Sequence, residues 1–302
     1  MDNVSEISPV MVVGATGYLG MEICRQLIAA KKRVKGLVRS SSDPGKVDAL
    51  KKMGVETVIG DMKDLTSLKQ AFQNVHAVIS TATATLSRQE GDSIESVDQN
   101  GQLNVIEAAK AAGSKQLVYI SFNEIAGEFP LQTAKRTVEK ELKESGLDYT
   151  ILQPAIFMEV WLSPMLGFDY PNARATLYGE GKSQISWISL NDVAAFAVAS
   201  LDNSSAKNAT IELGGPDAIS PLEVVKIFEE QTGNAFELTH VPIEALQAQK
   251  ESAADPISKS FAYLMISFTE GNIIDMRKTL DSFPLALRSV GDYAKGVVSN
   301  KH

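Results

Sequence analysis

Three glycines near the start of the chain constrain its fold more than any other feature. An apolar run at Pro9–Val13 leads directly into Gly14–Gly20, which reads GATGYLG, and an amphipathic stretch follows at 17–31. A strand that turns straight into a helix uses one glycine for the turn, one for close approach of a phosphate, and one for helix–strand packing. The helix N-terminus adds partial positive charge there. This loop is therefore predicted to bind a dinucleotide pyrophosphate, rather than to be a plain turn.

Short apolar runs and helical stretches alternate from residue 9 to about residue 155. Several runs are continuous in Val, Ile and Leu, as in strands that helices cover on both faces. This alternation predicts right-handed βαβ units and a Rossmann-type, doubly wound parallel sheet of the α/β class. We expect strands at Pro9–Val13, Arg33–Val38, Val55–Ile59, Ala77–Ser80, Gln116–Ser121 and Tyr149–Leu152, and helices at 17–31, 45–53, 64–73, 97–112 and 132–145.

The alternation of apolar runs and helical stretches ends after residue 155, where aromatic residues, proline and glycine become frequent. One further strand–helix unit and one further strand follow, and the tail from about residue 242 reads as mostly helical without assignable elements. We expect an NADP-binding domain over 1–155 with returning segments at about 183–216, and a smaller substrate lobe over 156–182 and 217–302.

Composition excludes several classes of function. The chain has 29 Lys+Arg against 37 Asp+Glu, a net charge of −8, which argues against nucleic-acid partners. A single cysteine, Cys24, excludes an internal disulfide, and three histidines leave little for a metal site, so none is expected. No apolar run reaches about 18 residues, so no membrane span is expected. The N-terminus lacks the pattern of a signal peptide, and we expect a cytoplasmic protein.

The glycine loop and four later segments resemble the atypical short-chain dehydrogenase/reductase superfamily, particularly the NmrA-like group and its quinone-reductase and isoflavone-reductase-like relatives. The later segments are Gly60-Asp61-Met62, NVIEAA from Asn104, LVYIS from Leu117 and YTILQP from Tyr149. The resemblance covers roughly residues 9–235. It implies a nucleotide-binding Rossmann fold and oxidoreductase chemistry, and says much less about the substrate.

The end of the second expected strand indicates which nicotinamide cofactor is used. NAD-selective sites place a carboxylate there, on the adenine ribose. Here Arg39, Ser40 and Ser41 follow the strand, and no acid occurs until Asp43. A guanidinium and hydroxyls suit a 2′-phosphate, so we expect NADP(H). The alternative interpretation is a basic surface turn.

The resemblance implies the rest of the cofactor site. The glycine loop would hold the pyrophosphate, Asp61 and Met62 would flank the adenine, and the segment after the fourth strand would line the inner ribose. The backbone after the sixth strand would reach the nicotinamide carboxamide. The implied residues, beyond those just named, are Gly14, Thr16, Gly17, Tyr18, Leu19, Gly20, Thr81, Ala82, Thr83, Pro154, Ala155 and Ile156.

The related dehydrogenases pair a tyrosine acid with a lysine four residues later, and here the pair reads Leu131 and Lys135. Lys135 shares one helical stripe with Leu131, Val138 and Leu142, which are all apolar. Burying a lysine on such a face is costly without a partner. We therefore expect Lys135 to be catalytic and to bind the nicotinamide ribose. The alternative is a lysine whose stem covers the edge of the core while its ammonium reaches solvent.

The missing tyrosine restricts the chemistry. A ketone reduced by hydride leaves an alkoxide that needs a placed proton donor. A quinone leaves a phenolate-like oxygen, whose conjugate acid has a pKa of about 10, so water can protonate it. Substitute donors stay open among Ser121, Tyr119, Tyr170 and Tyr178. The aromatic residues Phe122, Phe157, Trp161 and Phe168 are candidates for a substrate pocket or for an ordinary core.

Three functions remain after this reasoning. The one we favour is an NADPH-dependent oxidoreductase that transfers hydride to a small planar acceptor such as a quinone or an enone. The second is a non-catalytic NADP(H)-sensing regulator of the NmrA type, acting through a protein partner. The third is a nucleotide-sugar epimerase or dehydratase, which Leu131 in place of the tyrosine disfavours.

Overall fold

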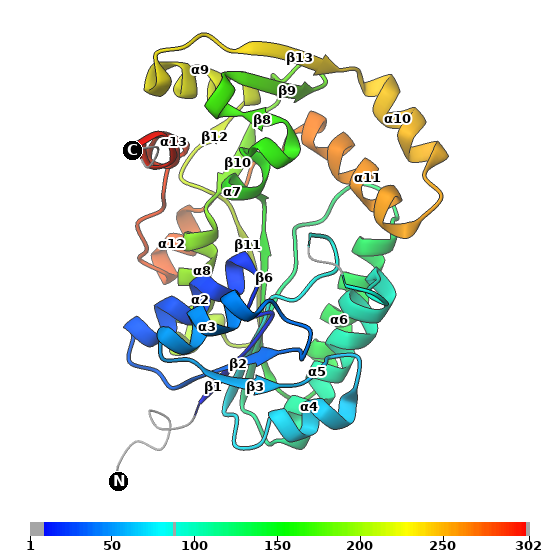
Figure 1. The fold of residues 1–302 in the computed structure, drawn as a ribbon, viewed down its shortest axis with the longest axis vertical. Helices are drawn as coiled ribbons and strands as arrows, with labels where there is room; N and C mark the ends of the chain where they lie inside the picture. Colours follow the sequence, from blue (N-terminus) through cyan, green and yellow to red (C-terminus); the bar gives the residue numbers. More distant parts are fainter. Residues whose placement is uncertain (1–8, 87–88, 300–302) are drawn as a thin grey trace. The chain divides into compact units, whose positions relative to one another are not determined.

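The computed structural model describes residues 9–86 and 89–299. The chain divides into two compact units, which we describe separately (Figure 1). The first unit consists of the chain up to Phe122, Leu131–Gln153 and Val193–Ile211. The second consists of Asn123–Pro130, Pro154–Asp192 and the chain from Glu212 onward.

A seven-stranded sheet, in the order β11-β6-β5-β4-β1-β2-β3, forms the centre of the first unit. The pairings from β3 across to β6 are all parallel. The chain leaves β1 toward β2 on one side and reaches β4 on the other, so the order reverses at β1. Such a switch point binds ligands at the carboxyl ends of the strands. The expected doubly wound α/β fold is confirmed. The strands are β1 (Val10–Val13), β2 (Val34–Val38), β3 (Glu56–Ile59), β4 (Ala77–Ser80), β5 (Gln116–Ile120), β6 (Asp148–Pro154) and β11 (Ala209–Leu213).

Helices connect these strands, as the periodicity predicted. The expected helix at 97–112 differs most from the structure, because a π-helix, η1 (Ile94–Gln99), precedes the α-helix. A capping box between Ser93 and Ser96 starts η1. The π-helix turns Asp98 into the interior, where its side chain is fully buried. The helices are α2 (Tyr18–Ala29), α3 (Pro44–Lys52), α4 (Leu65–Ala71), α5 (Asn100–Ala111), α6 (Pro130–Glu144), α8 (Leu190–Ala199) and η4 (Ser204–Ala206).

The second unit contains two three-stranded sheets, in the orders β12-β10-β7 and β13-β9-β8. Strand β13 is mostly exposed along its polar sequence, so no apolar alternation predicted it. Its ladder with β9 is parallel. The strands are β7 (Ile156–Phe157), β8 (Phe168–Asp169), β9 (Arg174–Tyr178), β10 (Ile185–Ile188), β12 (Ala218–Ile219) and β13 (Glu237–Val241).

The tail of the chain from about residue 242 is mostly helical, as expected, and supplies the last four helices described in the second unit. Ser220 and Glu223 form a capping box around Pro221, which starts α9, and Gly233 ends it with a φ of 71°. None of the helices in the described part of the chain is long and apolar enough to span a bilayer. The helices are α7 (Met158–Trp161), η2 (Pro164–Leu166), η3 (Tyr170–Asn172), α9 (Pro221–Thr232), α10 (Ile243–Ser252), α11 (Pro256–Glu270), α12 (Arg277–Ser282) and α13 (Val290–Ser299).

Candidate functional site

At the three glycines of the loop after β1, an added side chain would meet different surroundings. A Cβ at Gly14, whose φ is +85°, would lie 2.7 Å from Thr81 Oγ1, and one at Gly20 would lie 2.1 Å from the Gly14 carbonyl oxygen. Both positions are therefore closed by the protein's own packing of strand against helix. A Cβ at Gly17 would meet only the Gly14 oxygen, at 3.2 Å. Apart from that oxygen and the two chain neighbours of Gly17, no atom of the described residues lies within 4 Å of this position.

The N-terminus of α2 lies at Gly17, beside this space. Gly17 is its N-cap residue and supplies no side-chain acceptor to the first backbone N–H groups. The next residue, Tyr18, is 74% exposed, and the ammonium of Lys46 lies 5.8 Å from its ring centroid. Thr16 and Leu19 are half-buried on either side. Uncapped N–H groups beside an open space form an anion-binding site.

The segment after β4 packs against this loop. The Thr81 N–H donates to the Val13 carbonyl at 2.9 Å, which ties the ends of β1 and β4 together. Gln102 Nε2 donates to the Ala82 carbonyl at 2.8 Å, and the Thr83 and Thr85 hydroxyls are 3.2 Å apart. The structure thus places Thr81 and Ala82 next to Gly14.

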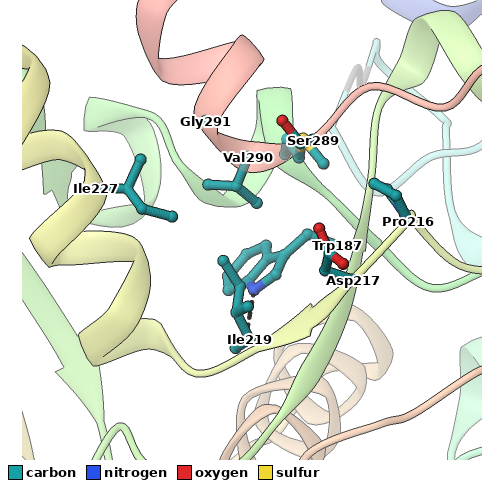
Figure 2. Close-up of a pocket in the computed structure, with 9 residues that line it drawn as sticks. Trp187, Pro216, Asp217, Ile219, Ile227, Ser289, Val290 and Gly291 are labelled. Atoms are coloured by element: carbon teal, nitrogen blue, oxygen red, sulfur yellow. Dashed lines mark hydrogen bonds between the residues drawn. The ribbon is translucent and has the colours of Figure 1, made fainter.

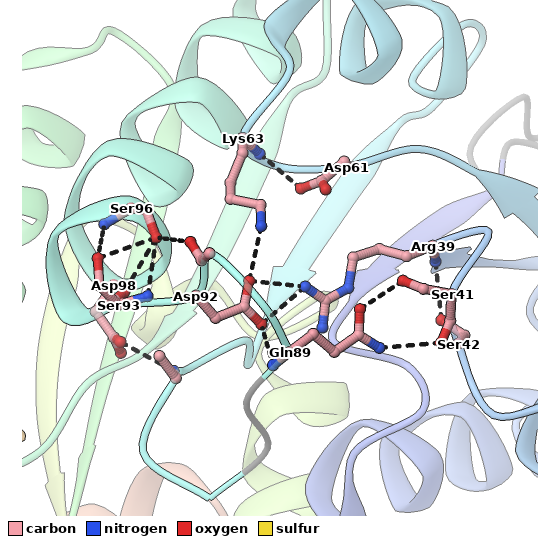
Figure 3. Close-up of polar contacts among 12 residues, drawn as sticks. Arg39, Ser41, Ser42, Asp61, Lys63, Gln89, Asp92, Ser93, Ser96 and Asp98 are labelled. Carbon is pink, nitrogen blue, oxygen red and sulfur yellow. Dashed lines mark hydrogen bonds and ion pairs between the residues drawn. The ribbon is translucent and has the colours of Figure 1, made fainter.

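The expected 2′-phosphate residues lie at the end of β2. The Arg39 guanidinium is 26% exposed and its Nη1 donates to both carboxylate oxygens of Asp92, at 2.9 and 2.8 Å (Figure 3). The Ser41 hydroxyl donates to Gln89, and Ser40 is exposed. Arg39 is therefore held by an acid that the sequence pattern did not indicate.

Asp61 and Met62 lie after β3. The Asp61 N–H donates to the Ser67 hydroxyl, and its carboxylate accepts the Lys63 N–H at 2.9 Å. Met62 is 8% exposed, and its carbonyl accepts from Asn104 Nδ2 at 2.9 Å. The loop after β3 is thus fixed at the same edge of the sheet as the loops after β1 and β2.

Lys135 is buried, and its neighbours on the stripe, Leu131, Val138 and Leu142, are buried with it. Its side chain is 7% exposed, its Nζ donates to the Ile120 carbonyl at 3.2 Å, and it lies 3.8 Å from Asp98 Oδ1. Burial lowers the pKa of Lys135, and the nearby carboxylate of Asp98 partly opposes that shift. The ammonium is therefore held inside the protein rather than reaching solvent from the edge of the core.

Asp98 is the main residue of this site that sequence reasoning missed. One carboxylate oxygen accepts the Ala84 N–H at 3.0 Å. The other, Oδ1, and the hydroxyl of Tyr119 have no hydrogen-bond partner among the described buried side chains. Burial and the charge of Asp98 raise the pKa of Tyr119 well above its usual value. Oδ1 is thus within ion-pair distance of the Lys135 ammonium but accepts no hydrogen bond from the described residues. A buried charged pair that is incompletely hydrogen-bonded is typical of a functional site.

A second buried acid, Glu139, lies one turn after Lys135 on α6. It accepts the Ser121 hydroxyl at 2.5 Å and Gln153 Nε2 at 2.9 Å, and it forms an ion pair with Arg136. Arg136 also donates to the Phe122 carbonyl at 2.7 Å and lies over the Phe122 ring. The Ser121 proton is therefore engaged with a carboxylate, and Phe122 is fixed at the end of β5.

The remaining predicted residues belong to the second unit. Its segment Pro154–Asp192 begins with Pro154, Ala155 and Ile156. The Ala155 N–H donates to the Leu213 carbonyl at 2.8 Å. The Trp161 ring stacks on Phe268 at 4.6 Å, and Phe168 is 5% exposed with its edge on Phe228. Phe157 is half-buried in β7. Phe168 thus contributes to the core of this unit.

A cavity of about 260 Å³ lies elsewhere in the second unit (Figure 2). The Trp187 ring forms part of its wall, with its Nε1 donating to the Ile219 carbonyl at 2.9 Å. None of the four predicted aromatic residues lines it. The lining residues are Met158, Trp187, Pro216, Asp217, Ile219, Ile227, Ser289, Val290 and Gly291.

Metal and thiol chemistry have no support in the described residues. Within residues 9–86 and 89–299, no three His, Cys, Asp or Glu side chains gather as a metal site would require. Cys24 is buried in α2, and burial raises the pKa of its thiol to about 12.

Comparisons with known proteins give a matching family model, relatives in sequence and structures of the same fold. A family model described as NmrA-like family matches residues 6–294. The photosystem II assembly factor Ycf39 of Synechocystis sp. is 34% identical over 79% of this chain and 72% of its own length. An NAD(P)H azoreductase of Xenophilus azovorans is 30% identical over 95% and 96% of the two chains. The NADPH complex of the Escherichia coli quinone oxidoreductase QOR2 has the same fold, with a TM-score of 0.76 at 22% identity over 95% and 99%.

Proposed function

The chain belongs to the NmrA-like family, and from that premise we propose that it is an NADPH-dependent reductase of a small planar acceptor such as a quinone or an enone. The observation that carries the proposal is Lys135, an ammonium buried beside a half-satisfied carboxylate in a helix where leucine replaces the usual tyrosine. The azoreductase relative, which matches nearly the full length of both chains, supports reductase chemistry with a nicotinamide cofactor.

The residues present fit such a cofactor. A side chain at Gly17 would occupy the space in front of the α2 N-terminus, where a pyrophosphate would accept backbone N–H groups. Arg39 supplies a guanidinium at the end of β2, where NADP-selective sites hold the 2′-phosphate. Lys135 would donate to the hydroxyls of the nicotinamide ribose. When bound, the reduced cofactor supplies hydride.

The chain's own groups set what the acceptor must be. Leu131 offers no proton, and the Ser121 hydroxyl donates to Glu139. The Lys135 ammonium donates to the Ile120 carbonyl and pairs with Asp98, and its remaining N–H would bind and orient the ribose. An acceptor that leaves a weakly basic oxygen, which water can protonate, therefore suits these residues best; a quinone leaves such an oxygen and a simple ketone does not.

Steady-state NADPH consumption with a panel of quinones, enones and simple ketones tests the proposal. We expect turnover with quinones, slower turnover with enones and none with simple ketones. Equal turnover with ketones would show that a proton donor is present and would overturn the acceptor class. Absence of turnover with every acceptor would overturn the reductase itself.

A second candidate is an NADP(H)-binding regulator or assembly protein without chemistry of its own. The assembly factor Ycf39, at 34% identity, favours it, and so does the absence of a tyrosine at position 131. Both candidates share the cofactor site, so NADPH binding does not separate them. Tight NADPH binding together with no oxidation by the whole panel would favour the regulator.

A further inference from the structure

Two cations from neighbouring strands converge on one buried acid in the first unit. Arg39 follows β2 and Lys63 follows β3, and these strands pair side by side. Lys63 Nζ lies 2.8 Å from one oxygen of Asp92, and Arg39 Nη1 lies 2.8 Å from the other. Figure 3 shows both side chains pointing at this carboxylate.

Both carboxylate oxygens of Asp92 accept hydrogen bonds in this arrangement, whereas the two cations keep donors without an acceptor among the described residues. Its side chain is 2% exposed and also accepts the Gln89 N–H at 3.0 Å. Burial raises the pKa of Asp92, but the hydrogen bonds from Lys63 and Arg39 outweigh it and lower the pKa overall, so the group is a carboxylate at neutral pH. Two positive charges against one negative charge leave a surplus of one.

The cations keep both exposure and free donors. The side chains of Arg39 and Lys63 are 26% and 28% exposed. Arg39 uses only Nη1 on Asp92, and its Nε and Nη2 make no hydrogen bond to the part of the chain that the structure describes. An ammonium has three donors, and one of those of Lys63 is taken by Asp92. Arg39 and Lys63 can therefore take a further anion on their outer sides.

A phosphate monoester suits this arrangement. The oxygens of its dianion accept hydrogen bonds from the planar donors of a guanidinium, and attract an ammonium as a point charge. The hydroxyls of Ser40 and Ser41 belong to the same turn as Arg39. On the proposed function, the adenosine 2′-phosphate would reach this edge of the sheet, at the carboxyl end of β2.

We propose that Lys63 is a second cationic ligand of the adenosine 2′-phosphate, and that Asp92 is a positioning residue that holds Lys63 and Arg39 together. The proposal rests on the proposed function for the cofactor class, and adds the residue that strengthens 2′-phosphate selectivity. Lys63 comes from a strand end that the sequence pattern assigned only to the adenine, and the pairing through Asp92 reveals it.

Isothermal titration with two fragments at fixed salt tests the assignment. The probes are adenosine 2′,5′-bisphosphate, which carries the 2′-phosphate, and ADP, which does not. Lys63→Gln should raise the Kd for the bisphosphate about tenfold, the effect expected of one charge-assisted contact, and leave the Kd for ADP unchanged. Lys69→Gln is the matched control, because Lys69 lies on α4 and pairs only at 3.7 Å with the exposed Glu107. It should change neither Kd.

The outcomes separate this proposal from the one that it rests on. If the unmodified protein binds both probes equally, the NADP(H) assignment fails. If it prefers the bisphosphate and Lys63→Gln keeps that preference, Lys63 does not contact the 2′-phosphate and this inference alone is overturned. A matched loss for both probes would show a general loss of charge or structure, and would overturn it too.

Discussion

The ammonium of Lys135 lies 3.8 Å from Oδ1 of Asp98, and both side chains are buried in the first unit. Asp98 comes from the π-helix before α5 and Lys135 from α6, so the pair joins two helices on the sheet. The Asp98 carboxylate offsets part of the cost of burying the ammonium. The pair lies where we propose that the nicotinamide ribose binds.

Replacing Asp98 by Asn should expose that cost. The amide can still accept from the Ala84 N–H, but the buried ammonium loses its opposite charge. We expect Asp98→Asn to lower the free energy of unfolding by about 1–3 kcal/mol, and to lower the pKa of Lys135 further. Urea denaturation at pH 7 measures the loss. A variant as stable as the unmodified protein would show that the ion pair contributes nothing.

Two glycine variants should separate binding from folding. Gly17→Val places a side chain in the open space beside α2, so it should abolish NADPH binding in a folded protein. Gly20→Val drives its Cβ to 2.1 Å from the Gly14 oxygen, so it should destabilise the fold itself. Fluorescence titration and thermal melts measure the two effects. Unchanged NADPH affinity in folded Gly17→Val would mean that the loop is only a turn.

Cofactor preference should depend on Arg39. The unmodified protein is expected to bind NADPH at least about tenfold tighter than NADH, and Arg39→Ala should remove most of that preference, since a charged hydrogen bond contributes about 1.5–3 kcal/mol. The Asp92 carboxylate would then keep Lys63 as its remaining cation. Equal affinities of the unmodified protein for the two cofactors, in a fluorescence titration, contradict the assignment.

Asp192 gives a prediction for pH in the second unit. Burial raises its pKa to about 6, although the Arg288 N–H donates to it at 2.9 Å. An acid with a raised folded-state pKa destabilises the fold when ionised, so the penalty is present above about pH 6 and disappears as the pH falls toward 3.8. Asp192→Asn should raise Tm by roughly 2–4 °C at pH 7.5 and by less at pH 4.5. An equal change at both pH values would contradict the raised pKa.

Local patterns predicted the scaffold well. The strands of the central sheet and the glycine loop are encoded within a few neighbouring residues, where periodicity and turn chemistry act. Gly14 lies beside Thr81 in the structure, because parallel strands end at the same edge of a sheet.

The polar contacts of the candidate site could not be predicted from local sequence patterns. Asp92 lies 53 residues from Arg39, and nothing near it in sequence indicates the pairing. Asp98 is one of several polar residues in a row, and only the π-helix turns it inward. Strand β13 is polar and exposed, so it forms through its ladder with β9 rather than through an apolar pattern. Such features depend on contacts between distant segments.

Single-turnover reduction of a quinone at saturating NADPH, by the unmodified protein and by Lys135→Met, tests the central claim most directly. Methionine keeps the apolar packing of the stem and removes the ammonium, and Lys140→Met, at an exposed position of the same helix, is the control. We predict a folded protein with a lowered Tm, because the buried Asp98 carboxylate loses its cation. We also predict weaker NADPH binding, and a rate at saturation that falls by up to about 100-fold, because small misplacements of a reacting ring are costly. Lys140→Met should match the unmodified protein. If Lys135→Met reduces the quinone as fast as the unmodified protein does, with the same NADPH affinity, Lys135 takes no part in the reaction and the account is contradicted.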